Sequence, residues 1–285
     1  MRCLKPVLVP DVGFVPCGQC IPCRLNYARQ WSIRIMDEAK MSKKSCFLTL
    51  TYDEDHLPAN RSIAKREVQL FLKRLRKAVA PDKIRFFASG EYGEHYQRPH
   101  YHLALFGIDV DSPVFVDRHY SPKKKVFYAR MPVWSNGFVA VGHLTVDSAN
   151  YIAGYMVKKI KGKDAEEHYK NLGIEPEFAL MSRRPGIGGD FLEKQGQHLK
   201  DVDFCVCKGR KQPLPRYYRN KLFSEDERDA LLMKKKSDEF DKWLADQENA
   251  VKYSYLTPEQ EEEKRIQFER NFNARRNLKE KPLND

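Results

Sequence analysis

The spacing of apolar residues along the chain predicts two amphipathic helices. Over residues 24–43 apolar side chains recur at steps of three and four, which is the period of a helix with one buried face. From Arg66 to Val79 the same spacing forms an apolar stripe, while lysines and arginines fill the remaining surface. Pro81 lies just beyond this segment, as expected where a helix ends.

Segments rich in β-branched and aromatic residues predict strands between and after these helices. They are Cys46–Tyr52, Ile84–Ser89, Tyr101–Phe106 and Gly137–Val146. Asp147 or Ser148 then caps a third helix that runs to about Ile160. This order predicts an α+β fold, in which helices cover one face of a mainly antiparallel sheet.

Composition divides the chain into four parts. We expect a cysteine cluster and a helix in residues 1–45, the core in 46–160, a loop-rich extension packed on the core in 161–220, and a charged tail, helical or partly disordered, in 221–285. Of 51 lysines and arginines and 39 acidic residues, this tail holds 14 and 16. The positive excess therefore lies in residues 1–220, where it would attract a polyanion.

Several classes of protein are disfavoured by the sequence. No apolar run approaches the roughly 20 residues needed to span a bilayer, and the first residues do not resemble a secretory signal. We therefore expect a cytoplasmic protein with no membrane partner. Seven cysteines, an odd number, argue against a disulfide framework.

Three of the cysteines have the spacing of metal ligands. Cys17, Cys20 and Cys23 form a C-x2-C-x2-C pattern, which suits a structural zinc ion. A tetrahedral site needs a fourth ligand, and the open candidates are Cys3, Cys46, Cys205 and Cys207. The alternative is a turn with free, partly buried thiols.

A His-hydrophobic-His pattern predicts a second metal site. On a strand, His100 and His102 point to one face and Tyr101 to the other. Glu91 could complete the site across a hairpin, and Glu94 is the alternative if the hairpin loop is short. Such a set accepts Mg²⁺ or, more readily, Mn²⁺, and the bound ion would polarise phosphoryl oxygens. The alternative is a surface histidine pair without a metal.

The third predicted helix carries two tyrosines and a lysine on one face. Tyr151 and Tyr155 are one turn apart, and Lys158 follows three residues later. Tyrosine can form a covalent intermediate, and a nearby cation would stabilise its phenolate, since the phenol pKa is about 10. The alternative is a core helix with buried rings and a basic end.

Together these motifs resemble the HUH endonuclease superfamily. Its members share a strand like residues 47–52, a His-hydrophobic-His strand and a helix with one or two tyrosines and a lysine. The paired tyrosines, with the segments at residues 17–23, 90–102, 182–188 and 213–218, are similar to the replication initiators of gokushoviruses, a group of microviruses. The resemblance covers roughly residues 15–220. It implies a central antiparallel sheet flanked by helices, to which this chain adds its charged tail.

The resemblance also implies a function. His100, His102 and Glu91 would hold the metal, and a tyrosine would attack origin DNA, leaving a 5′-phosphotyrosine and a free 3′-hydroxyl for the host DNA polymerase. The second tyrosine would cut the regenerated origin, so that the released circle can be closed. The expected substrates are single-stranded DNA and replicative-form origin DNA in the host bacterial cell. The candidate DNA-binding side chains are Arg98, Lys159, Arg183 and Arg184. No ATPase motif is visible, so we expect a host helicase to unwind the duplex.

Other functions stay open at this point. A basic antiparallel sheet with aromatic side chains also suits a non-catalytic protein that binds single-stranded nucleic acid. That alternative does not account for a histidine pair and a tyrosine pair together. A transposase or relaxase of the same superfamily would share the chemistry. A zinc-ribbon-like scaffolding protein would leave residues 84–160 without a role.

Overall fold

The computed structural model describes residues 3–10, 12–93, 96–158, 163–234, 237–238 and 257–279. For residues 155–158, 163–166, 261, 269 and 272–279 it describes the backbone alone. The chain forms two compact units, Met1–Pro215 and Arg216–Asp285. Every candidate site residue named above belongs to the first unit.

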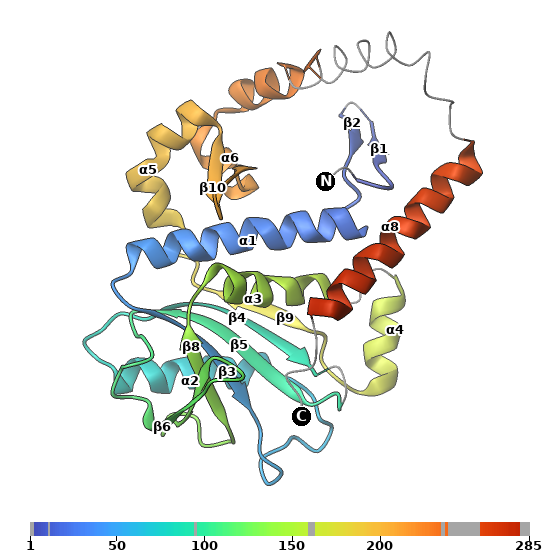
Figure 1. Ribbon diagram of the computed structural model, residues 1–285. Helices are drawn as coiled ribbons and strands as arrows, with labels where there is room; N and C mark the ends of the chain where they lie inside the picture. Colours follow the sequence, from blue (N-terminus) through green and yellow to red (C-terminus); the bar gives the residue numbers. More distant parts are fainter. Residues whose placement is uncertain are drawn as a thin grey trace. The chain divides into compact units, whose positions relative to one another are not determined.

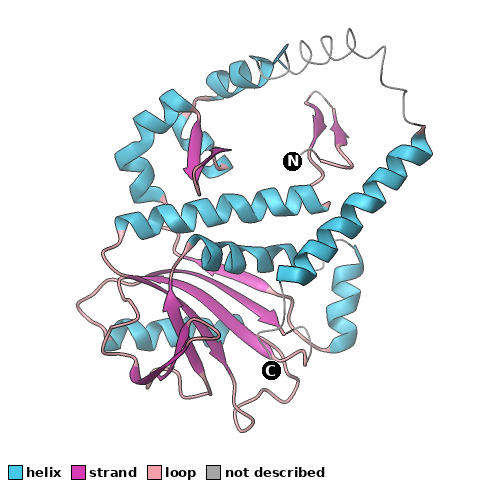
Figure 2. Ribbon diagram, viewed as in Figure 1, coloured by secondary structure: helices cyan, strands magenta, loops and turns pink. Residues whose placement is uncertain are grey.

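A seven-stranded antiparallel sheet forms the centre of the first unit (Figures 1 and 2). In spatial order its strands are β6 (Val116–Ser121), β7 (Val126–Arg130), β8 (Val139–His143), β3 (Ser45–Thr51), β5 (Pro99–Phe106), β4 (Arg85–Tyr92) and β9 (Phe178–Met181). The predicted α+β class, with a central antiparallel sheet flanked by helices, is confirmed.

Helices cover both faces of this sheet. α1 (Ile21–Met41) and α3 (Val146–Lys158) lie on one face, and α2 (Lys65–Ala78) lies on the other (Figure 1). The prediction that helices cover one face is therefore wrong. The reason is that the central strands are apolar in both directions: Leu103 packs in the core beneath α2, whereas Ala104 and Phe106 pack with residues of α1 and α3.

The apolar stripe predicted for α2 is confirmed. Val68, Phe71, Leu72 and Leu75 are buried against the sheet. Burial of each such side chain contributes about 1.5–3 kcal/mol, which holds the helix in place despite its many charged residues.

The segment expected to be loop-rich contains regular elements instead. They are α4 (Lys163–Leu172), β9, α5 (Gly189–Val202), β10 (Phe204–Cys207), β11 (Arg210–Pro213) and the start of α6 (Arg216–Leu222). The glycines before α5 indicated a loop, yet Gly188 sits at the N-cap of that helix with a φ of 77°. Tertiary contacts then stabilise the helix, because Leu192 and Leu199 are buried.

The β6–β7 hairpin was also missed from the sequence. Most residues of β6 are exposed, so the strand lacks the alternation that marks a half-buried strand. Its place in the sheet depends on the pairing of β7 with both β6 and β8. Long-range pairing, rather than a local apolar pattern, therefore creates this edge.

Two short hairpins form separate sheets, β1 (Val7–Val9) with β2 (Gly13–Val15), and β10 with β11 (Figure 2). In the second unit α6, residues 225–234 and α8 (Pro258–Lys279) are helical, so the predicted tail contains helices where it is described. None of the helices described by the structure combines the length and apolarity that crossing a bilayer requires.

Candidate active site

Strand pairing brings the three predicted metal ligands to one face of the sheet. β4 and β5 pair so that Glu91 is opposite His100. Directly opposed residues in an antiparallel pair project to the same side. The Nε2 atom of His102 lies 2.8 Å from a carboxylate oxygen of Glu91. Tyr101 projects to the other face, as predicted, where its hydroxyl lies 2.9 Å from that of Tyr52.

β4 extends three residues beyond the predicted end, to Tyr92, so Glu91 is a strand residue. The Gly-Glu-Tyr-Gly sequence looked like a turn, but its glycines serve close packing. A Cβ atom at Gly90 would come within 2.8 Å of the Phe178 ring, and one at Gly93 within 3.0 Å of the His100 ring. Glu94, the alternative ligand, lies outside the described residues.

Hydrogen bonds orient both imidazoles. The Nδ1 atom of His100 lies 2.6 Å from the carbonyl oxygen of Arg98. A carbonyl only accepts, so Nδ1 carries the proton and Nε2 keeps a lone pair for a metal ion. Burial, and secondarily the neighbouring His102, lowers the pKa of His100, which favours the neutral, ligating form. The two rings are parallel within 1°, with centroids 6.2 Å apart.

Thr49 is a site residue that sequence reasoning missed. Its hydroxyl lies 2.9 Å from Nδ1 of His102 and so leaves Nε2 directed at Glu91. Phe47, two residues earlier on β3, stacks on the same ring with a centroid distance of 5.9 Å. The alternation within residues 47–52 could have revealed this, because it places Phe47 and Thr49 on one face.

We expect Thr49→Val to weaken metal binding about 10–100-fold while leaving the fold intact. Valine keeps the shape of threonine but removes the hydroxyl that orients His102. The measurement is the Mn²⁺ dissociation constant, by calorimetry. Thr51→Val, the matched control on the same strand, should change it little. Equal affinities for both variants would show that the hydroxyl of Thr49 does not orient the ligand.

Helix α3 places Tyr151 beside the histidines. The centroid of its ring lies 5.2 Å from that of His102, and the ring planes meet at 79°. Ala149 and Ile152 are buried beneath the helix and set its orientation on the sheet. Tyr151 is 42% exposed, so it is not a buried core ring and DNA can reach it.

The partners expected for Tyr151 are described less fully. Tyr155 and Lys158 belong to the same helix, but the structure describes their backbone alone. Lys159 lies outside the described residues. Their predicted roles stay predictions.

Arg98 ties two segments of the chain together. Its guanidinium donates to the carbonyl oxygen of Tyr52 at 2.8 Å and forms an ion pair with Glu54. This arrangement anchors the start of β5 to the end of β3. Its expected contact with DNA stays a prediction.

Arg183 and Arg184 are exposed in the loop before α5. The glycine amides of this loop were expected to meet phosphates, but the N–H of Gly188 donates to the buried carboxylate of Glu38 at 2.7 Å. That amide is therefore used within the protein, whereas both arginine side chains face solvent.

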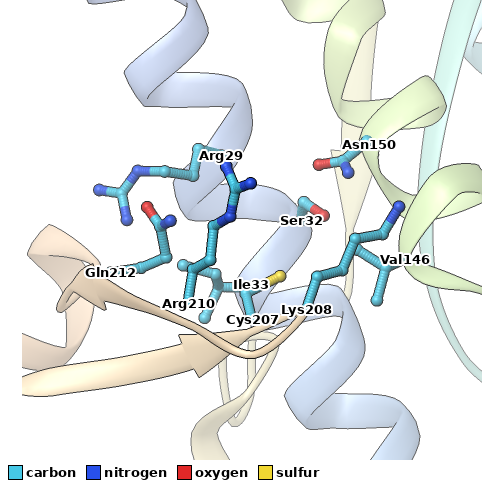
Figure 3. A pocket seen from close by; sticks show the side chains of 9 residues that line it. All are labelled: Arg29, Ser32, Ile33, Val146, Asn150, Cys207, Lys208, Arg210 and Gln212. Atoms are coloured by element: carbon cyan, nitrogen blue, oxygen red, sulfur yellow. The ribbon is translucent and has the colours of Figure 1, made fainter. Parts of the chain in front are cut away.

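A basic pocket of about 540 Å³ lies between α1, α3 and the β10–β11 hairpin (Figure 3). Its polar lining consists of Arg29, Ser32, Asn150, Lys208, Arg210 and Gln212. The buried hydroxyl of Ser32 has no hydrogen-bond partner among the described residues. Since Asn150 lines the pocket and Tyr151 contacts His102, the pocket and the histidines lie on different sides of α3. Sequence reasoning missed the pocket because three distant segments form it.

Comparison with known proteins assigns a class to this fold and site. The family model for the replication-associated protein ORF2 matches residues 45–160, which run from β3 through α3 and carry Glu91, the histidine pair and Tyr151. The fold and site therefore define a replication-associated protein. No solved structure gives a significant match.

Individual relatives come from three phages. The chain is 33% identical over 218 residues to replication-associated protein VP4 of Bdellovibrio phage phiMH2K, covering 72% of this chain and 66% of that protein. It is 32% identical over 225 residues to replication-associated protein ORF2 of Spiroplasma virus 4, covering 74% and 68%. For replication-associated protein ORF4 of Chlamydia phage 1 the identity is 28% over 224 residues, covering 74% and 55%. The protein belongs to this family of phage replication-associated proteins, and spans just under two thirds of the length of the Bdellovibrio phage relative.

Proposed function

We propose that the protein is a rolling-circle replication initiator with an HUH endonuclease core, which nicks single-stranded or supercoiled origin DNA by tyrosine attack. One observation carries the proposal: the accessible ring of Tyr151 lies against His102, whose Nε2 meets the carboxylate of Glu91. A candidate nucleophile and candidate metal ligands thus share one face of the sheet. Membership in a phage replication-associated family supports this function.

The ligand set suits Mg²⁺ or Mn²⁺. His102 and Glu91 already converge, and the proton-bearing Nδ1 of His100 leaves its Nε2 for coordination. The set is more open than the cysteine cluster, which is the group of described residues whose ligand atoms all lie within 4.8 Å of one another. When bound, the ion would polarise the scissile phosphate and hold it in place.

In the proposed reaction the phenolic oxygen of Tyr151 or Tyr155 bonds to phosphorus, and the bond from phosphorus to the 3′ oxygen breaks. The 3′ oxygen takes up a proton and becomes the hydroxyl that a host polymerase extends. The 5′ phosphate stays on the tyrosine, so joining needs no nucleotide cofactor. Lys158 is proposed to stabilise the negative charge that develops. The second tyrosine repeats the attack after one round, when the waiting 3′-hydroxyl closes the circle.

The basic pocket is proposed to hold the backbone of the DNA strand that flanks the cleaved bond. Arg29, Lys208 and Arg210 supply positive charge, although Lys208 also pairs with Asp147. The unpartnered hydroxyl of Ser32 is a donor suited to a phosphate oxygen. Phosphate contacts position DNA without reading its sequence, so the pocket would contribute affinity rather than origin choice.

We expect Arg210→Gln to weaken binding of single-stranded DNA and to reduce the slope of log affinity against log salt by about 1. Arg210 lines the pocket, whereas Lys211, the next residue on β11, lies over the ring of Phe204 outside it. Lys211→Gln removes the same charge and is the matched control. Titration at several salt concentrations measures both slopes. Equal effects of the two substitutions would mean that the pocket does not contact DNA.

A nicking assay tests the proposed function. A supercoiled plasmid carrying the origin of the parent genome is incubated with the protein and Mn²⁺ or Mg²⁺, with and without EDTA. We expect a nicked circle whose 5′ end is linked to protein, and no product with EDTA. Tight DNA binding without any nick, at several metal concentrations, would instead support the non-catalytic binding protein. A host helicase and polymerase complete the proposed pathway in the infected bacterium.

A further inference from the structure

Four cysteines gather around the start of α1. The sulfur atoms of Cys3, Cys17, Cys20 and Cys23 all lie within 4.8 Å of one another. Those of Cys3 and Cys20 are 3.7 Å apart. A zinc ion bound tetrahedrally by four thiolates, with zinc–sulfur bonds of about 2.3 Å, requires sulfur–sulfur distances of about 3.8 Å. The cluster therefore has the dimensions of a closed zinc site.

The fold selects Cys3 from the four candidates for the fourth ligand. Cys46 lies on β3, fully buried in the core beneath α2. Cys205 and Cys207 lie on β10, in the other short hairpin, and Cys207 lines the basic pocket. The described residues thus supply one complete set of four thiols.

Backbone N–H groups around the cluster are arranged for thiolates. Those of Gln19 and Cys20 point to the sulfur of Cys17, at 3.4 and 3.3 Å, and that of Cys17 points to the sulfur of Cys3 at 3.3 Å. Gly18 has a φ of 72°, which permits the tight turn that presents two of these donors. Such donors stabilise negative sulfur, the form that binds metal.

The β1–β2 hairpin needs an anchor that apolar burial does not provide. Each strand has three residues, and Val7, Leu8 and Phe14 are exposed by 50%, 64% and 74%. A two-stranded hairpin of this size is marginally stable by itself. Cys3 and Cys17 flank its open end, where Val7 pairs with Val15. Crosslinking these two cysteines to Cys20 and Cys23 would close the hairpin and attach it to α1.

We propose that Cys3, Cys17, Cys20 and Cys23 bind one zinc ion that joins the β1–β2 hairpin to the start of α1. Four protein ligands leave no open coordination position, so the site is structural and does not take part in cleavage. The proposal is independent of the proposed nicking activity.

Metal analysis of the full chain, purified under reducing conditions without chelator, tests the site directly. We expect one zinc per chain that survives dialysis. Replacement by Co²⁺ should produce the visible absorption of a tetrahedral tetrathiolate complex. Protein that lacks zinc and takes up neither metal when titrated would overturn the proposal.

Single substitutions test the identity of the fourth ligand. Cys3→Ser should lose the tightly bound zinc, whereas Cys207→Ser, the matched control, should retain one equivalent. Cys3→His should restore binding, because imidazole can replace a thiolate. Cys3 lies outside the central sheet, so circular dichroism should show that Cys3→Ser keeps the main fold. Retention of zinc and of the tetrathiolate spectrum in Cys3→Ser would overturn the assignment.

Discussion

Replacing both Tyr151 and Tyr155 by Phe should abolish the covalent protein–DNA adduct on a single-stranded origin oligonucleotide. We expect a loss of at least about 10³-fold, as is typical when a nucleophile is removed. Phe preserves the ring contacts of Tyr151 with His102 and Phe47, so packing beneath the helix should be unchanged. The adduct is detected as a shifted band on a denaturing gel after incubation with Mn²⁺.

The single variants should separate the two tyrosines. Each should retain some cleavage of the oligonucleotide, because the other phenol lies one helical turn away, but each should fail to release closed circles from the complete reaction. Tyr120→Phe, which changes an exposed tyrosine on β6, is the control and should behave as the unsubstituted protein. An adduct that persists in the double variant would place the nucleophile elsewhere and would refute the proposed mechanism at its centre.

Replacing His100 and His102 by Ala should abolish cleavage while largely preserving DNA affinity. A bound divalent ion stabilises transition-state charge by several kcal/mol, so its loss should slow cleavage by about 10³-fold or more. Binding should persist because arginine and lysine side chains, rather than the ion, supply most of the attraction to DNA. Adduct formation and DNA affinity are measured on the same preparation.

Controls must separate lost chemistry from lost stability, because His102 is buried. His102→Gln retains a polar side chain of similar length and should also be inactive, while a thermal melt reports its stability. His119→Ala changes an exposed histidine on β6 and should be fully active. Full nicking by the His100→Ala/His102→Ala variant in EDTA would exclude a metal site at this position.

The errors in the predicted fold share a physical cause. The β6–β7 hairpin and α5 have few local features of a strand or helix, and long-range contacts hold them: β7 pairs with β8, and the N-cap Gly188 donates to Glu38 of α1. The cover on the second face was missed because residue alternation on a central strand does not reveal that both faces are apolar enough to bury. These features depend on residues far apart in the chain.

The sequence by itself determined the local geometry of the candidate site. The two-residue period of a strand puts His100 and His102 on one face, and the helical period puts Tyr151 and Tyr155 one turn apart, wherever the segments are placed. It also determined the order of the motifs, and hence the family resemblance that the comparisons confirmed.

Only the tertiary structure decided how these segments meet. The register of β4 against β5 aligned Glu91 with His100, and the packing of α3 laid Tyr151 against His102. The same is true of Cys3, which the path of the β1–β2 hairpin returns to Cys17. Periodicity follows from the backbone geometry of each residue, whereas register and packing minimise the free energy of the whole chain, so no local pattern contains them.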